Sequence, residues 1–121
     1  MAVTHASQWL EREDVGDVTV VRLRTPKVCD EDTVRAVFDP IYTLAGIGRN
    51  RLALNLAAVE FLPSMALGKL VMLNRKVQAA GGKLVLCQIS PTAQAILEAT
   101  RLDELFAICI TEQEAVQSFA A

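Results

Sequence analysis

The chain has 121 residues, of which 52% are apolar and 21% are charged. This length is that of one ordinary domain, and the composition excludes a disordered or fibrous protein. Twelve lysine and arginine residues stand against 14 aspartate and glutamate residues, so the net charge is −2. Proteins that bind nucleic acid usually carry a basic excess. We therefore expect one domain over residues 1–121, with no nucleic acid among its partners.

Two short strands are predicted first, over residues 9–13 and 18–23, from their apolar and β-branched residues. The turn between them, at 14–17, is short enough for a hairpin. We expect Glu11 and Glu13 of the first strand to lie on a solvated face. A helix should open at the acidic segment 30–32, because carboxylates suit the positive end of a helix.

The first helix has one irregular position. Its apolar residues recur at helical spacing and define one buried face: Val34, Val37, Phe38 and Ile41. Pro40 stands inside this pattern. Because proline removes an amide donor, we expect a kink or an interruption there. Glycine and asparagine residues end the segment by position 50.

Strands and helices alternate over the rest of the chain. Strands are predicted at 52–56, 83–89 and 106–110, and the first two are apolar enough to be buried on both faces. Helices are predicted at 64–80, from Ser90-Pro91, and from the capping-box segment 111–114. The order β-β-α-β-α-β-α-β-α predicts an α/β fold with a mixed, mainly parallel sheet.

Cysteine usage and hydropathy favour a cytoplasmic protein without membrane contact. The most apolar stretch, residues 61–73, is interrupted by Pro63, Gly68 and Lys69, and a span needs about 18 apolar residues. No signal-peptide pattern is visible. The three cysteines are Cys29, Cys87 and Cys109, and they form no CxxC pair, which favours reduced thiols. We expect Cys87 and Cys109 to be small buried hydrophobes.

Residue types needed for catalysis are scarce. His5 is the only histidine, and we expect it in a frayed terminus where a catalytic triad would be poorly held. One histidine and scattered cysteines cannot make a standard zinc site. The sequence contains neither GxGxxG nor GxxxxGK[ST]. We therefore predict no enzyme, no catalytic residues, no cofactor and no metal site.

The segment 60–70 is the strongest candidate site. It follows a buried strand and opens a helix, at the edge of a parallel sheet where ligands and partners gather. Ser64 is predicted as the N-cap, where a phosphate would meet free amides and add a charge of about −1.5 to −2. Two interpretations stay open: Ser64 is a regulatory phosphorylation site, or it only caps the helix. The candidate partner-binding residues are Leu62, Pro63, Ser64, Met65, Ala66, Leu67 and Lys69.

Three segments resemble those of STAS domains, the fold of anti-sigma factor antagonists. They are residues 52–64, residues 80–87, and the blocks between Ser90 and Val116. Members of that family typically carry Asp-Ser-Ser or Asp-Ser-Thr and then Gly at the helix start. The first Ser is phosphorylated by a serine kinase that is also the anti-sigma factor. Ser64 takes that position, with Pro63, Met65 and Ala66 replacing the acidic residue, the second hydroxyl residue and the glycine.

The resemblance implies a STAS-like fold and a non-enzymatic bacterial regulator of transcription. Its partner would be an anti-sigma factor or a related serine kinase, and partner switching would release a sigma factor, with Ser64 as the control point. We expect a monomer or a weak homodimer. Two alternatives stay open: an unphosphorylated scaffold, which Pro63 and Met65 favour, and a small-ligand sensor at the same helix start.

Overall fold

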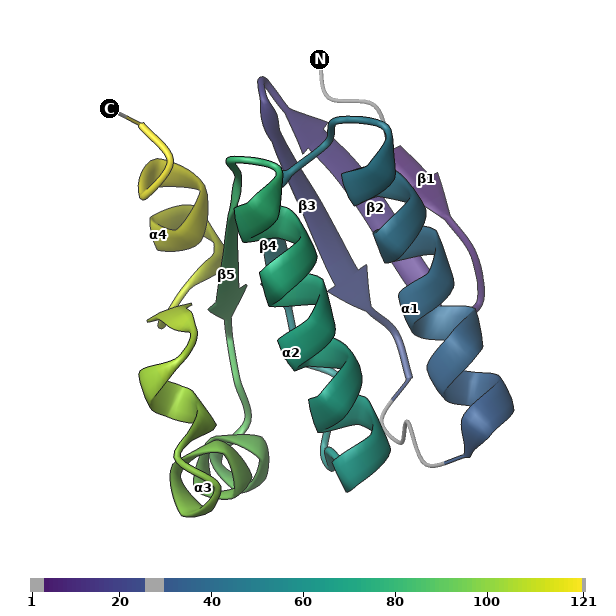
Figure 1. Ribbon diagram of the computed structural model, residues 1–121, viewed down its shortest axis with the longest axis vertical. Helices are drawn as coiled ribbons and strands as arrows, with labels where there is room; N and C mark the ends of the chain where they lie inside the picture. The colour runs from purple at the N-terminus through teal and green to yellow at the C-terminus, as the bar shows by residue number, and fades with distance from the viewer. Residues whose placement is uncertain (1–3, 26–29, 121) are drawn as a thin grey trace.

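A six-stranded sheet forms the centre of the protein, with helices on both of its faces (Figure 1). The computed structural model describes residues 4–25 and 30–120. In chain order the elements are β1 (Thr4–Ala6), β2 (Leu10–Val15), β3 (Val18–Leu23), α1 (Glu31–Gly46), β4 (Arg51–Asn55), α2 (Ser64–Ala79), β5 (Lys83–Cys87), α3 (Pro91–Ala99), a 3-10 turn (Leu102–Glu104), β6 (Ala107–Cys109) and α4 (Glu112–Gln117).

The sheet is mixed, as the element order predicts. Its strand order is β1-β2-β3-β4-β5-β6, with antiparallel pairing from β1 to β3 and parallel pairing from β3 to β6. The sequence pattern missed β1, because three residues are too few to show a period of two. His5 pairs with Arg12 in this edge strand, so the expectation of a frayed terminus was wrong there.

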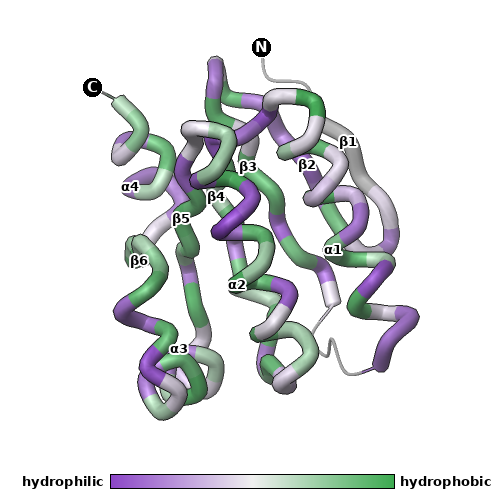
Figure 2. Tube along the Cα trace, in the orientation of Figure 1, coloured by the Kyte–Doolittle hydropathy of each residue, from purple (hydrophilic) through white to green (hydrophobic). Residues whose placement is uncertain are grey.

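The two faces of the sheet bury different amounts of apolar surface. Helices α1 and α2 lie side by side over one face, and hydrophobic and hydrophilic residues alternate along both (Figure 2). Leu52, Leu54, Leu84 and Leu86 pack on that side, each with at most 2% of its surface exposed. The opposite face has smaller side chains and packs against α4 through Ala115. The central strands are therefore buried on both faces, as predicted.

Three helix starts carry side-chain caps, and those at Ser90 and Thr111 were predicted from the sequence. Each cap satisfies an amide that the first helical turn leaves without an acceptor. The pairs of acceptor and amide are Asp30 with Thr33 (2.7 Å), Ser90 with Ala93 (3.2 Å) and Thr111 with Glu114 (3.1 Å).

Of the two expectations for Pro40, a kink or an interruption of α1, the interruption was wrong. The helix is continuous from Glu31 to Gly46 with Pro40 inside it. Pro40 is exposed, so its ring lies on the side of the helix away from the core, and the helix loses one amide donor there without displacing a buried side chain. The apolar residues of the opposite side stay buried and hold the helix on the sheet.

No helix within residues 4–25 and 30–120 combines the length and the apolarity that crossing a bilayer would require.

Candidate partner-binding site at the start of helix α2

The loop between β4 and α2 lies at the edge of the sheet where the parallel strands end (Figure 1). Three hydrogen bonds fix its course. The Leu56 amide donates to Cys87 O (3.0 Å), the Ala57 amide donates to Asn55 Oδ1 (2.9 Å), and Ser90 Oγ donates to Val59 O (3.0 Å). The loop is thus tied to β4, to β5 and to the start of α3, and these ties set the position of the first turn of α2.

Ser64 is the first residue of α2 and not its N-cap, so that prediction was wrong. The N-cap is Pro63, which has extended dihedral angles (φ −70°, ψ 165°) and makes no side-chain capping bond. The first main-chain helical bond runs from Leu67 N to Pro63 O (3.0 Å), which leaves the amides of residues 64–66 without an acceptor in the helix. The Ser64 side chain is exposed. The first turn contains no acidic residue, so nothing in it balances the positive end of the helix.

The structure divides the predicted partner-binding residues into two groups. Leu62, Ala66 and Leu67 are buried, with 2%, 0% and 8% of their surface exposed. They pack into the main core and hold the helix start in place. Ser64 and Met65 are exposed, while Pro63 and Lys69 are half-buried. Any contact made in this conformation therefore comes from the second group.

Two exposed apolar side chains near this group were missed from the sequence. Phe61 is 48% exposed and Met72 is 57% exposed, beside Met65 at 46%. Met65 and Met72 are seven residues apart, so they lie on one side of the helix. The seven-residue spacing could have indicated a shared exposed side. However, methionine in an apolar helix is usually a core residue, and the neighbouring apolar residues Leu70 and Leu73 are indeed buried.

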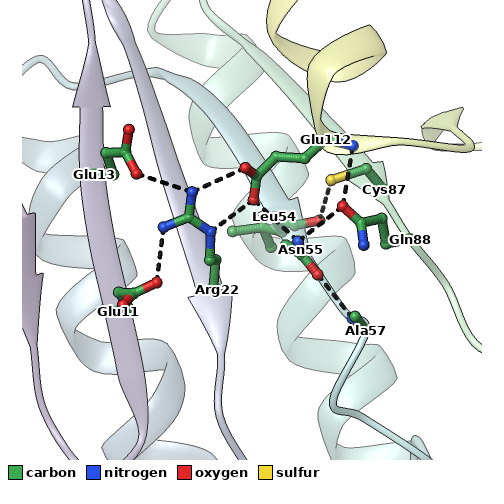
Figure 3. A network of polar contacts seen from close by, with 9 residues as sticks. All are labelled: Glu11, Glu13, Arg22, Leu54, Asn55, Ala57, Cys87, Gln88 and Glu112. Atoms are coloured by element: carbon green, nitrogen blue, oxygen red, sulfur yellow. Dashed lines mark hydrogen bonds and ion pairs between the residues drawn. The ribbon is translucent and has the colours of Figure 1, made fainter. Parts of the chain in front are cut away.

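A polar network on the other face of the sheet is centred on Arg22 of β3 (Figure 3). Its guanidinium donates to Glu11 (2.7 Å) and Glu13 (2.9 Å) of β2. It also binds both carboxylate oxygens of Glu112 at the start of α4, at 2.8 and 2.9 Å. Glu11 and Glu13 therefore do not form the solvated face that the sequence predicted, because the cation on the neighbouring strand engages both carboxylates.

The network continues to the loop that precedes α2 (Figure 3). Asn55 Nδ2 donates to Glu112 Oε1 (3.0 Å), and Asn55 Oδ1 accepts the Ala57 amide. Gln88, in the left-handed region at φ 51°, accepts the Glu112 amide at 3.2 Å. Hydrogen bonding to Glu112 raises the pKa of Arg22, and Arg22 in turn lowers the pKa of Glu112. One charged cluster thus joins the hairpin, α4 and the β4–α2 loop.

We expect acid to remove the contribution of Glu112 to stability. Its folded-state pKa is lowered from an ordinary value of 4.5, so the ionised carboxylate stabilises the fold above about pH 4.5. This contribution is lost as the pH falls through the lowered pKa. Urea unfolding of the wild type and of Glu112→Gln at several values between pH 7 and pH 3 measures it. The two should differ at neutral pH and converge in acid; a constant difference would contradict the assignment.

The prediction of a buried thiol is confirmed for Cys87 and was wrong for Cys109. Cys87 is fully buried, its thiol donates to Leu54 O (3.5 Å), and burial raises its pKa to about 12. Cys109 is half-buried and also free, whereas Cys29 lies outside the described residues. In the part of the chain that the structure describes, no three histidine, cysteine or acidic side chains gather as a metal site would require.

The fold and the helix start define a small α/β module with an exposed serine at the edge of a mixed sheet. The STAS domain family matches residues 10–115, so the chain belongs to that family. The chain is similar to an anti-sigma-factor antagonist STAS protein of Planctomyces limnophilus, with 23% identity and a TM-score of 0.81, covering 93% of this chain and 98% of that one.

Two further solved structures share the fold. An anti-sigma factor antagonist from Mycobacterium paratuberculosis is 24% identical with a TM-score of 0.79, covering 100% of this chain and 96% of that one. Phosphorylated SpoIIAA, a Bacillus cell fate determinant, is 22% identical with a TM-score of 0.68, covering 90% and 97%. At these identities the likeness shows a common fold.

Proposed function

We propose that this chain is a bacterial, cytoplasmic anti-sigma factor antagonist without enzymatic activity. It binds an anti-sigma factor that is also a serine kinase, and the complex frees a sigma factor for transcription. Phosphorylation of Ser64 ends the interaction. The observation that carries the proposal is the exposed Ser64 side chain on an uncapped helix start. Membership of the STAS family and the likeness to solved antagonists support it.

The geometry suits reversible modification. The kinase reaches Ser64 without unfolding the helix start, because the buried side chains of Leu62, Ala66 and Leu67 hold the turn from beneath. The Ser64 oxygen attacks the γ-phosphorus of ATP, its proton passes to the kinase, and ADP leaves. The resulting dianion lies close to the free amides of the first turn, which stabilise negative charge. It also lies beside Met65 in the contact surface, where desolvating it weakens binding.

Mapping the phosphate tests the modification. The purified protein is incubated with ATP and its cognate kinase-like anti-sigma factor, and the phosphorylated residue is identified by mass spectrometry. We expect phosphate on Ser64 in the wild type and none in Ser64→Ala. Phosphate on another residue, or none from a kinase that phosphorylates a control substrate, would overturn the switch.

We expect Ser64→Asp to bind the unmodified anti-sigma factor at least tenfold more weakly, which corresponds to about 1.4 kcal/mol. Ser64→Asn is the matched control, since it has the same shape without the charge and should bind nearly as the wild type does. An acidic residue at this helix start stabilises the helix, so a loss of binding would not reflect unfolding. Isothermal titration calorimetry measures both constants.

Equal affinities of the wild type, Ser64→Asp and the phosphorylated protein would favour the scaffold alternative. Pro63 and Met65 support that alternative, because they replace the polar neighbours of the serine in the family pattern.

A further inference from the structure

Helix α2 carries positive charge only, although the whole protein has a net charge of −2. Its charged residues are Lys69, Arg75 and Lys76, and its sequence contains no aspartate or glutamate. Within residues 4–25 and 30–120, the ion pairs involve other cations: Arg12, Arg22, Arg35, Arg49 and Arg101. The cations of α2 thus have no carboxylate partner among the described residues.

These cations share one side of the helix with exposed methionines. Met65, Met72 and Lys76 are separated by seven and four residues, which places them in a line along the helix. Gly68 lies between the two methionines, and a Cβ there would meet no atom within 4 Å. We call this surface the methionine–lysine face: Met65, Gly68, Lys69, Met72, Arg75 and Lys76.

Tyr42 of α1 holds two of the ammonium groups in place. Lys69 Nζ lies 5.9 Å and Lys76 Nζ lies 5.5 Å from the centre of its ring. The Tyr42 hydroxyl donates to Lys69 O at 2.9 Å, which fixes the ring against α2. Cation–π contacts restrict both lysine side chains before any partner arrives, so binding costs less side-chain entropy.

We infer that the methionine–lysine face docks an acidic protein surface, one in which carboxylates surround apolar side chains. This inference rests on the proposed function in taking α2 as the element that contacts the partner. Charge complementarity carries it, since two ordered cations without a carboxylate are best matched by carboxylates. The exposed side chains of Met65 and Met72 need an apolar counterpart, and methionine adapts readily to such surfaces.

The same chemistry explains how phosphorylation would act. A phosphate on Ser64, at the start of the helix that bears this face, has the same sign of charge as the carboxylates of the partner, so it repels them. The effect of phosphorylation on binding should therefore shrink as salt screens the charges.

A designed peptide tests the face without any knowledge of the natural partner. The probe is a helical peptide with leucines on one side, flanked by glutamates. The comparison probes are the same peptide with lysine at each glutamate, a polyglutamate peptide without leucine, and vesicles containing anionic phosphatidylglycerol. Each is titrated into the ¹⁵N-labelled full chain, and amide shifts are followed by NMR. We expect the glutamate–leucine peptide to shift amides of residues 64–79 and to bind at least tenfold more tightly than the others.

Two double variants with reversed charge serve as the test and its matched control. The test variant, Lys69→Glu/Lys76→Glu, should bind the glutamate–leucine peptide at least tenfold more weakly than the wild type does. Arg51→Glu/Lys83→Glu makes the same change of charge at two exposed cations on β4 and β5 and should leave binding within twofold. The same variants are then tested against the kinase-like anti-sigma factor, with the same expectation.

The outcomes separate this inference from the proposed function. If the kinase does not bind the wild type but the peptide binds as described, the proposed function fails and the face stands. Equal binding of the lysine peptide, shifts outside α2, or equal loss in the control pair would overturn the acidic partner. Vesicles or polyglutamate that bind as tightly as the glutamate–leucine peptide would overturn it in favour of a membrane or a simple polyanion.

Discussion

Replacing Arg22 with methionine is expected to lower the free energy of unfolding by about 2–3 kcal/mol. The substitution keeps the length of the aliphatic stem and removes the guanidinium. Glu11, Glu13 and Glu112 would then lose their cation while remaining close to one another. Removing the cation leaves the three carboxylates partly desolvated, and they repel one another. The start of α4 would also lose its ion pair with β3.

Arg12→Met is the matched control for this prediction. Arg12 and Arg22 have equally exposed side chains, at 27%, and lie on neighbouring strands. Among the ion pairs of the described residues, Arg12 binds only Asp14, and Asp14 keeps a second partner in Arg49 at 2.8 Å. We expect this loss to cost less than about 1 kcal/mol, as for exposed ion pairs. Urea unfolding followed by circular dichroism measures both variants, and equal costs would show that the Arg22 network adds nothing beyond a surface pair.

A double-mutant cycle isolates the contact between Arg22 and Glu112. If this pair carries most of the effect, Arg22→Met should cost much less in a Glu112→Gln background than in the wild type. Additive costs would instead assign the stability to Glu11 and Glu13.

Gly82→Ala is expected to lower the free energy of unfolding by about 3 kcal/mol, at the upper end for overpacking. A Cβ at Gly82 would lie 2.6 Å from Asn50 Cβ and closer still to the Asn50 carbonyl oxygen. That oxygen accepts the Lys83 amide (2.9 Å), and the Asn50 side chain donates to Ala80 O (3.0 Å). Making room for the methyl group therefore disturbs two hydrogen bonds of Asn50, one to the start of β5 and one to the residue that follows α2.

Gly68→Ala is expected to raise the free energy of unfolding, the opposite of the effect expected for Gly82→Ala. Gly68 lies on the exposed side of α2, where a Cβ meets no atom within 4 Å. Alanine in a helix interior is about 0.5–1 kcal/mol more favourable than glycine. We expect Gly68→Ala to raise the midpoint of urea unfolding. Similar destabilisation by both substitutions would contradict the close approach of Gly82 to Asn50.

The candidate site was only partly predictable from sequence. Ser64 could be found, because a helix after a buried strand has to start near it. That Ser64 is the first helical residue could not be predicted, because both Pro63 and Ser64 are compatible with the N-cap position. The two possible helix starts differ by a single residue. The burial of Leu62, Ala66 and Leu67 depends on how the first turn of α2 packs into the core. Sequence periodicity alone cannot divide a uniformly apolar segment into contact and core residues.

The sequence by itself determined the order of the helices and strands after β1, the mixed sheet, and the caps at Ser90 and Thr111. These features are local: a cap spans three residues and an apolar period spans one element. Only the tertiary structure decided that Arg22 meets Glu112, 90 residues away, and that Tyr42 meets Lys69 across two helices. Such contacts depend on the register of neighbouring strands and on helix packing, which bring together side chains that share no local pattern.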